Sequence, residues 1–185
     1  EGVRHPKPYG SFNCIQDGSL RNHGYEFVSS PLSSATALKA FAELHEHLTF
    51  YDKEDPFSIR TSTHVHVNVL GMEMKQVRNF VLLYALFEEF FFTLVKPARR
   101  DNIHCVPLTE TYLPSIYKKD LKHYVSAWHK YTALNLKRIP DLGTIEFRHM
   151  HGTGDVEEMR VWLHVLENLW KLAQRVDINK ETLCN

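Results

Sequence analysis

The chain contains 185 residues, which is about one domain with a single generous core. Hydrophobic residues make up 43% and charged residues 24% of it, close to the globular average, which excludes a disordered or fibrous chain. The 22 basic and 22 acidic side chains cancel, so overall charge gives no reason to expect a nucleic acid or an anionic membrane as a partner.

The cysteines and the apolar stretches of the sequence indicate the cellular compartment of the protein. Cys14, Cys105 and Cys184 lie far apart in the sequence, which argues against a disulfide framework or a zinc ribbon and favours a reducing compartment. Residues 80–95 form the longest apolar stretch, but two glutamates interrupt it and it is shorter than the roughly 20 residues that span a bilayer. The start of the chain has no apolar run typical of a secretory signal. We therefore expect a soluble, cytoplasmic protein that does not bind membranes.

The N-terminal part predicts short strands, turns and one helix. Turn-forming residues dominate the opening positions, and residues 25–28 are predicted as a short strand. A serine then caps a helix expected over residues 34–48. His45 and His47 lie two positions apart in this helix, and because that spacing points their side chains in nearly opposite directions, they cannot share a ligand.

Residues 61–70 change to strict alternation, which predicts a strand with one dry and one polar face. Valines occupy the dry face, whereas His64 and His66 occupy the polar face. The following segment, residues 74–95, is too long for a strand and is predicted as a buried helix that closes before Pro97.

The next segments predict further strands around a surface helix. Residues 103–107 are expected to form a short strand, and residues 115–130 a charged surface helix. Residues 132–136 and 144–150 are predicted to pair as strands around the turn at residues 140–143.

The last segment gives the clearest helical pattern in the chain. Apolar residues recur at alternating spacings of three and four, which predicts an amphipathic helix over residues 156–175. Asp155 and Glu158 are expected to form a capping box at its start. Together the elements predict one α+β domain over residues 1–185, with a mainly antiparallel sheet whose apolar face is covered by helices.

Two predicted strands place paired ionisable groups on a polar sheet face. His64 and His66 are two residues apart on one strand, and Glu146 and Arg148 repeat this spacing on another, with apolar residues behind both pairs. A carboxylate, two imidazoles and a guanidinium suit a divalent metal together with phosphate. A solvated sheet face, or a structural ion pair between Glu146 and Arg148, is the alternative interpretation.

Several ordered blocks of the sequence form a recognisable set of motifs. The blocks are Asp17-Gly18-Ser19-Leu20, Gly24 to Leu32, His64-Val65-His66-Val67, Arg100 with His104-Cys105-Val106-Pro107, Tyr131 to Asn135, Thr144-Ile145-Glu146-Phe147-Arg148, and Gly152-Thr153. In this order they closely resemble the motifs of the putative amidoligase family, which belongs to the glutamine-synthetase-like carboxylate–amine ligases and is often encoded by phages and fungi. The resemblance extends from about residue 17 to residue 176.

The resemblance implies a funnel-shaped antiparallel sheet that holds ATP and Mg²⁺ or Mn²⁺. By this likeness His64, Glu146 and Glu26 would be metal ligands. His66 would contact the nucleotide phosphates, and Arg148 would clamp a phosphate.

Three further basic residues follow from the same likeness. Lys137 and Arg138 are similar to a basic stretch near the transferred phosphoryl group in glutamine synthetase. Arg100 matches a family arginine that we expect to contact substrate or phosphate.

The chain departs from the family pattern at its start. Members of the superfamily normally begin with a strand that carries a Gly-x-Glu-x-Glu pattern, and no such pattern precedes Asp17. We expect either that the native N-terminus is missing or that part of the metal site has been lost.

The activity implied by the resemblance is an ATP-dependent carboxylate–amine ligase that acts through an acyl-phosphate. Its substrates would be small-molecule or peptide carboxylates and amines, and oligomerisation stays open. A non-catalytic binding or assembly module is the second hypothesis. The third is a Zn²⁺ hydrolase that uses His64, His66, His149 and His151, but a regular strand would turn His149 away from Glu146 and Arg148.

Overall fold

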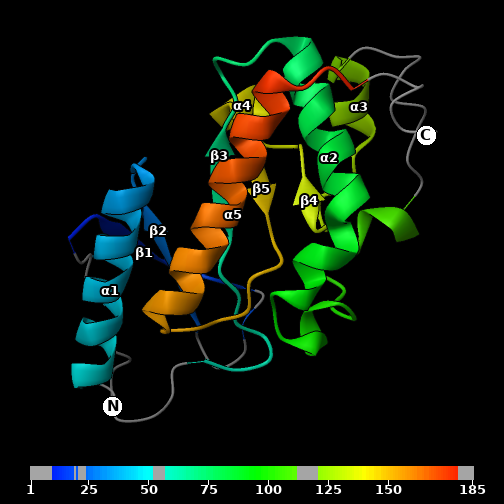
Figure 1. Cartoon of the computed structure of the whole chain (residues 1–185). Helices are drawn as coiled ribbons and strands as arrows, with labels where there is room; N and C mark the ends of the chain where they lie inside the picture. Colours follow the sequence, from blue (N-terminus) through cyan, green and yellow to red (C-terminus); the bar gives the residue numbers. More distant parts are fainter. Residues whose placement is uncertain (1–9, 19, 21–23, 52–56, 112–120, 179–185) are drawn as a thin grey trace. The chain divides into compact units, whose positions relative to one another are not determined.

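The computed structural model describes residues 10–18, 20, 24–51, 57–111 and 121–178 (Figure 1). The chain divides into two compact units, and each is described by itself. One unit contains residues up to 61 together with 152–163, and the other contains residues 62–151 and those from 164 onward. The start of the chain before residue 10, where the family's acidic strand is expected, and Cys184 lie outside the described residues. The single domain stays a prediction.

The first unit contains a two-stranded sheet and a helix. β1 (Phe12–Gln16) pairs antiparallel with β2 (Tyr25–Ser29). The helix α1 (Ser34–Tyr51) begins after Ser33, whose Oγ accepts a hydrogen bond from the Thr36 N–H at 3.3 Å. This bond satisfies one of the free N–H groups of the first turn and confirms the predicted serine cap.

The second unit is built on a three-stranded antiparallel sheet in the order β3–β5–β4. Its strands are β3 (Val65–Asn68), β4 (Leu134–Asn135) and β5 (Thr144–Phe147). The register sets Glu146 of the central strand opposite His66 on one side and Asn135 on the other. The antiparallel pairing and the mixture of helix and sheet confirm the predicted α+β class, and the glutamine-synthetase-like funnel stays a prediction.

The strands are shorter than predicted because their ends leave the regular ladder. Beyond β3 and β5, Ser62 and His151 form only an isolated bridge, and the Thr63 N–H donates to the Met150 oxygen at 2.9 Å. The prediction of a strand over residues 103–107 is wrong. Only Val106 bridges there, in parallel, to the segment just before β4.

The connection between β4 and β5 contains a helical turn, α4 (Ile139–Leu142), where the sequence predicted a simple turn. Gly143 ends it with φ 66°, a left-handed conformation that glycine adopts without steric cost. A Cβ at this position would also lie 2.2 Å from Leu70 Cγ, so two separate constraints favour glycine.

Helix α2 (Met74–Thr93) packs on the apolar face of the β3–β5–β4 sheet. The Phe147 ring lies 5.8 Å from the ring of Phe80, 5.9 Å from that of Tyr84 and 6.0 Å from that of Phe91, measured between centroids. Helix α2 ends at Thr93, two residues before the predicted end, and a short 3₁₀ helix, η1 (Pro97–Arg99), begins at the proline. A second 3₁₀ helix, η2 (Leu108–Glu110), follows Pro107.

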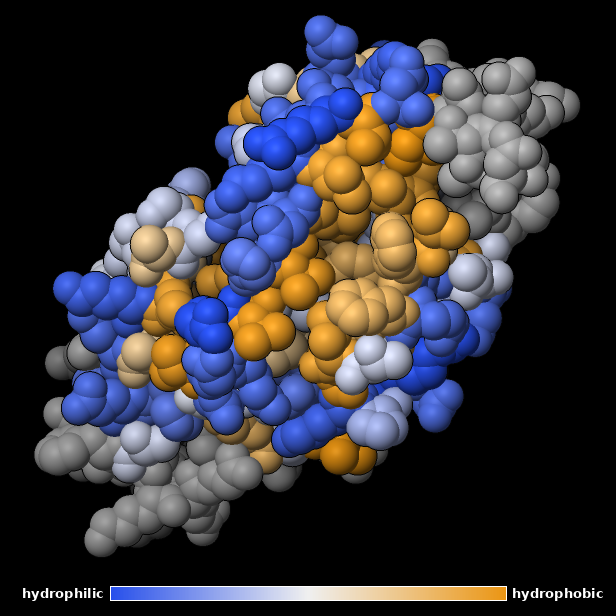
Figure 2. All heavy atoms as spheres, in the orientation of Figure 1, coloured by the Kyte–Doolittle hydropathy of each residue, from blue (hydrophilic) through white to orange (hydrophobic). Residues whose placement is uncertain are grey.

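Helix α2 is apolar on a second side as well. On the face of the molecule that Figure 2 shows, hydrophobic side chains gather over α2. Leu86, Phe87 and Phe90 of this helix are exposed by 64%, 44% and 50%. The predicted buried helix is therefore only partly buried, because some of its apolar residues lie in the core and others on the surface.

The remaining helices are α3 (Leu121–Ala127) and α5 (Val156–Arg175). The bounds predicted for α5 are confirmed, whereas the predicted surface helix ends at Ala127, and residues 115–120 lie outside the described residues. Asp155 Oδ1 accepts from the N–H groups of Glu157 and Glu158 at 2.8 and 3.1 Å, and so caps α5. None of the helices in the described ranges is long and apolar enough to cross a bilayer.

Candidate active site

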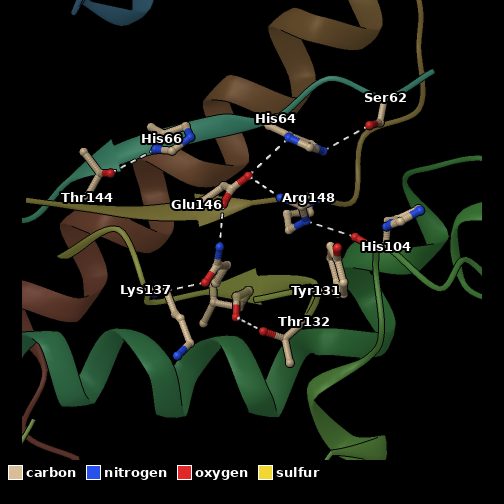
Figure 3. A network of polar contacts seen from close by, with 12 residues as sticks. Ser62, His64, His66, His104, Tyr131, Thr132, Lys137, Thr144, Glu146 and Arg148 are labelled. Atoms are coloured by element: carbon tan, nitrogen blue, oxygen red, sulfur yellow. Dashed lines mark hydrogen bonds and ion pairs between the residues drawn. The ribbon is translucent and has the colours of Figure 1, made fainter. Parts of the chain in front are cut away.

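Glu146 is the centre of a polar network on the face of the sheet opposite α2 (Figure 3). The residue is only 4% exposed. Its Oε1 accepts from Arg148 Nη1 at 2.6 Å and lies 3.2 Å from His64 Nδ1. Its Oε2 accepts from Asn135 Nδ2 at 2.6 Å. The predicted convergence of His64, Glu146 and Arg148 on one face is therefore confirmed, and the ion pair between Glu146 and Arg148 is present.

These contacts keep the Glu146 carboxylate charged despite its burial. Burial alone would raise its pKa, but the hydrogen bond from His64 and the charge of Arg148, with a smaller contribution from Asn135, lower the pKa to about 2. At neutral pH the site therefore contains a buried anion that can attract a cation.

His64 is held at both ring nitrogens. Nδ1 faces Glu146, and Nε2 lies 3.0 Å from Ser62 Oγ. A second contact of this kind fixes ring orientation, as it does for histidines that ligate metals. Because the strand alternates, Ser62 reaches the same face as His64 even though it lies beyond the regular part of β3.

His66 lies opposite Glu146 in the register and is bonded to Thr144, since its Nδ1 lies 2.9 Å from Thr144 Oγ1. Partial burial lowers the pKa of His66, and the opposing attraction of Glu146 does not restore it. The imidazole is therefore neutral at pH 7, so any contact with a phosphate would be a neutral hydrogen bond.

Two arginines form a reciprocal clasp at the end of β5. Arg148 Nε donates to the carbonyl oxygen of His104 at 2.9 Å. In return Arg99, which is 2% exposed, donates from Nη2 to the Arg148 carbonyl at 2.6 Å and from Nε to the His149 carbonyl at 2.9 Å. The segment with Arg99 and His104 and the segment with Arg148 and His149 thus each donate from a guanidinium to backbone carbonyls of the other. These bonds fix the position of Arg148.

The other predicted basic residues make contacts elsewhere. Lys137 Nζ donates to the Ser126 carbonyl at 3.0 Å, and Arg138 Nη1 donates to Asp141 Oδ2 at 3.0 Å. Lys137 lies on the same side of the network as β4 in Figure 3. Its backbone N–H donates to Asn135 Oδ1 at 3.0 Å, which ties this lysine to the Glu146 network through Asn135.

Arg100 and Glu26 are not among the contacts of Glu146. Arg100 donates to Glu110 at 2.5 Å and to Glu89 at 3.1 Å, and lies 5.3 Å over the Phe92 ring. Glu26 lies on β2, in the other compact unit. Their roles as substrate contact and metal ligand stay predictions.

The opposite face of the sheet contains His149, which is fully buried. Tyr84 Oη donates to Glu88 Oε1 at 2.7 Å and lies 2.8 Å from His149 Nε2, which assigns the proton on that nitrogen to His149. Glu88 in turn accepts from the backbone N–H groups of Leu108 at 2.5 Å and Thr109 at 2.8 Å. His149 therefore points away from His64 and His66, and the zinc hydrolase hypothesis has no support from the described histidines.

No separate role was assigned from the sequence to several residues of the network, among them Ser62, Arg99, Tyr131 and Asn135. Asn135 and Tyr131 lie within one of the motif blocks, so their positions were available as a signal. Ser62 continues the alternation of His64 and His66. The burial of Arg99 had no local signal, because its partners are carbonyls of a distant strand.

The donors near Glu146 are few in number. In the described part of the chain no group of three or more His, Cys, Asp or Glu side chains is arranged to hold a metal ion. His64 and Glu146 supply one nitrogen and one carboxylate. Mg²⁺ is commonly bound through one or two carboxylates while it keeps several waters and binds substrate phosphates. A partial protein ligand set of this kind is compatible with it.

One comparison with known proteins gives a match. The family described as putative amidoligase enzyme matches residues 9–170, which cover most of the chain. The chain therefore belongs to this family, and His64, Glu146 and Arg148 all lie within the matched region. No curated protein and no solved structure matches the chain.

Proposed function

We propose that the protein is an ATP-dependent ligase that joins a carboxylate to an amine through an acyl-phosphate. The observation that carries the proposal is the buried, charged Glu146 between His64 and Arg148 on one sheet face. Membership of the amidoligase family supports the ligase class. ATP and the divalent metal belong to the proposal.

Glu146 and His64 would hold Mg²⁺ or Mn²⁺. When bound, the metal would neutralise charge on the ATP phosphates. Arg148 already contacts Glu146, so the guanidinium would lie beside the phosphates. Its planar fork matches the geometry of phosphate oxygens.

The reaction has two transfers. The γ-phosphoryl group moves from ATP to an oxygen of the substrate carboxylate, and ADP leaves. The amine nitrogen then bonds to the acyl carbon while the carbon–oxygen bond to phosphate breaks, so that phosphate and one proton are released and an amide remains. Arg148, with Lys137 and Arg138, would stabilise the charge of the moving group by electrostatic positioning. His66 would donate a neutral hydrogen bond to the phosphates, and Arg100 would contact substrate.

A binding or assembly module is the second candidate, and one observation favours it. Both carboxylate oxygens of Glu146 already have partners within the protein, from His64, Arg148 and Asn135. A network that is complete in this way can serve stability alone.

The test of the ligase proposal is ADP release by the full chain from ATP, with Mg²⁺ or Mn²⁺ and pooled carboxylates and amines. We expect release that depends on both pools and falls at least a hundredfold in Glu146→Gln. Thr49→Ala, a change on the exposed part of α1, serves as the control. Release that does not depend on a carboxylate, or no release with any pool, would contradict the proposal.

Metal binding is tested separately by isothermal titration with Mn²⁺. We expect the affinity to fall at least tenfold in the His64→Ala, Glu146→Ala double variant. Unchanged affinity in a folded double variant would refute these two ligands.

Arg148→Lys separates catalysis from architecture. Lysine keeps the charge but loses the planar fork, so we expect ADP release to fall roughly a hundredfold while the melting temperature changes little. A large loss of stability with unchanged turnover per folded molecule would instead favour the binding module.

A further inference from the structure

The far side of Arg148 faces a cluster of cations and aromatic rings, which we call the Tyr131 cluster: His104, His129, Lys130, Tyr131 and the outer edge of Arg148. The Arg148 guanidinium carbon lies 6.0 Å from the centre of the Tyr131 ring, and Lys130 Nζ lies 4.5 Å from the same centre. The rings of His104 and His129 stand edge-on to it at 4.9 and 5.6 Å. In Figure 3 the side chain of Tyr131 points toward Arg148.

Backbone pairing fixes this cluster beside the Glu146 network. The Val106 N–H donates to the Tyr131 carbonyl at 2.8 Å, and the Ala133 N–H donates to the Val106 carbonyl at 2.7 Å. The Arg148 N–H donates to the Ala133 carbonyl at 2.9 Å. These bonds hold three chain segments side by side and fix the backbone of Tyr131 relative to that of Arg148.

The cluster is rich in donors and poor in acceptors. Within the described residues, Lys130 has no acidic partner, and the Tyr131 hydroxyl has no hydrogen-bond partner. Arg148 uses Nη1 for Glu146 and Nε for His104, and its Nη2 has no partner there either. The Lys130 ammonium and one edge of the Arg148 guanidinium therefore lie near the Tyr131 ring, and these two groups and the Tyr131 hydroxyl are donors without an acceptor among the described residues.

The charge behind the cluster has the same sign. Arg99 is buried, and the described groups that accept from it are the carbonyls of Arg148 and His149 and the Cys105 side chain, none of which is a carboxylate. Burial lowers its pKa, and Arg148 acts in the same direction. Glu146 is already shared between Arg148 and His64. Of the four charged side chains Arg99, Lys130, Arg148 and Glu146, three are positive and one is negative, and an anionic ligand would reduce their mutual repulsion.

We infer that the Tyr131 cluster binds a second carboxylate of the substrate, so that the substrate is a short dicarboxylate. This inference rests on the proposed ligase function. Arg148 lies between the two regions, since its Nη1 donates to Glu146 and its guanidinium carbon lies 6.0 Å from the centre of the Tyr131 ring. A substrate whose unreactive carboxylate binds Lys130, Tyr131 and Nη2 would present its other carboxylate one guanidinium away, beside Glu146. A monocarboxylate would leave the cluster's donors without an acceptor.

Binding of succinate and glutarate to the full chain, measured by calorimetry, tests this inference. We expect each to bind at least tenfold more tightly than butyrate and glutaramate, which lack the second carboxylate. Lys130→Met should weaken glutarate binding roughly tenfold and Tyr131→Phe several-fold, because each removes one donor to a carboxylate. Lys122→Met, at an exposed lysine of α3 that lies outside the Tyr131 cluster, should leave glutarate binding unchanged.

Two results would overturn the inference. One is equal affinity for glutarate and butyrate, or equal effects of Lys130→Met and Lys122→Met. The other is competition between glutarate and the non-hydrolysable nucleotide AMP-PNP with Mg²⁺, since the cluster would then bind nucleotide phosphate rather than substrate.

The failure of the ligase proposal has a different signature. Selective glutarate binding with no ADP release would refute the ligase while the carboxylate subsite stands. ADP release with monocarboxylates, at a KM that Lys130→Met does not change, would refute the subsite while the ligase stands.

Discussion

The two faces of the β3–β5–β4 sheet each bury an ionisable group from the same chain segment. One face stabilises the charged form of its group, and the other stabilises the neutral form. Glu146, 4% exposed, remains an anion because His64, Arg148 and Asn135 all donate to it or attract it. His149, 0% exposed, remains neutral because burial, with a smaller contribution from Arg99, lowers its pKa to about 3. Burial alone therefore does not decide the charge of a group, and its partners do.

The largest expected effect of a single change is on the apolar face. Phe147→Ala should lower the free energy of unfolding by about 3–5 kcal/mol, because the ring is fully buried against α2 and leaves a cavity. Phe90→Ala, at a half-exposed phenylalanine of α2, is the matched control and should cost far less. Urea titration of both variants measures the difference. Equal losses would show that α2 does not cover this face of the sheet in solution.

On the polar face, Arg148→Ala should cost about 2–3 kcal/mol in urea titration. This is less than the 3–5 kcal/mol expected for a fully stranded buried charge, because His64 and Asn135 remain beside Glu146. A cost below about 0.5 kcal/mol would mean that the pair is solvated and that the polar face adds little to stability.

Acid should affect the two faces in different pH ranges. The folded pKa of His149 lies below its unfolded value of 6.5, so the unfolded chain binds the extra proton and stability falls as pH drops below 6.5. Between pH 7 and pH 5 this amounts to about 2 kcal/mol. Glu146 contributes stability above its unfolded pKa of 4.5, and this contribution is lost as pH falls from there toward 2.

The variant His149→Gln separates these ranges. It should remove most of the pH dependence between 7 and 5 and leave the loss below pH 4.5 in place, as measured by urea titration at each pH. If the variant keeps the dependence of the natural protein between pH 7 and 5, His149 is not the neutral buried group described above.

The smallest expected effect is that of His64→Gln. One partner of Glu146 is weakened, so stability should fall by about 1 kcal/mol and the pKa of Glu146 should rise from about 2 toward 4.5. The carboxyl ¹³C shift of Glu146 reports this titration directly. His66→Gln is the control because His66 is bonded to Thr144, and it should move the pKa of Glu146 less.

Periodicity predicted the parts of the fold that depend on local pattern. The bounds of α5 follow from its apolar spacing, and the common face of His64, His66, Glu146 and Arg148 follows from strand alternation. The strand over residues 103–107 was wrong because β-prone residues there bridge a neighbour only at Val106. Local propensity cannot report the absence of a partner strand.

The sequence before β5 contains a signal for a short helix rather than for a simple turn. Pro140 occupies the first turn of α4, and Gly143 follows its end, which is the usual asymmetry of a short helix. By contrast, the contacts of Arg99 could not be predicted. They depend on carbonyl groups, which every residue has, and on a fold that brings η1 to the end of β5.

The clasp between Arg99 and β5 also has a kinetic consequence. Its two hydrogen bonds join residues 50 and 49 positions apart in the sequence, so a long loop must close before either can form. We expect these bonds to be absent from the folding transition state, with φ values near zero at Arg99. Shortening this side chain would then leave the folding rate unchanged and speed unfolding. The rate at which the end of β5 around Arg148 unfolds therefore depends in part on Arg99, which lies 49 positions earlier in the sequence.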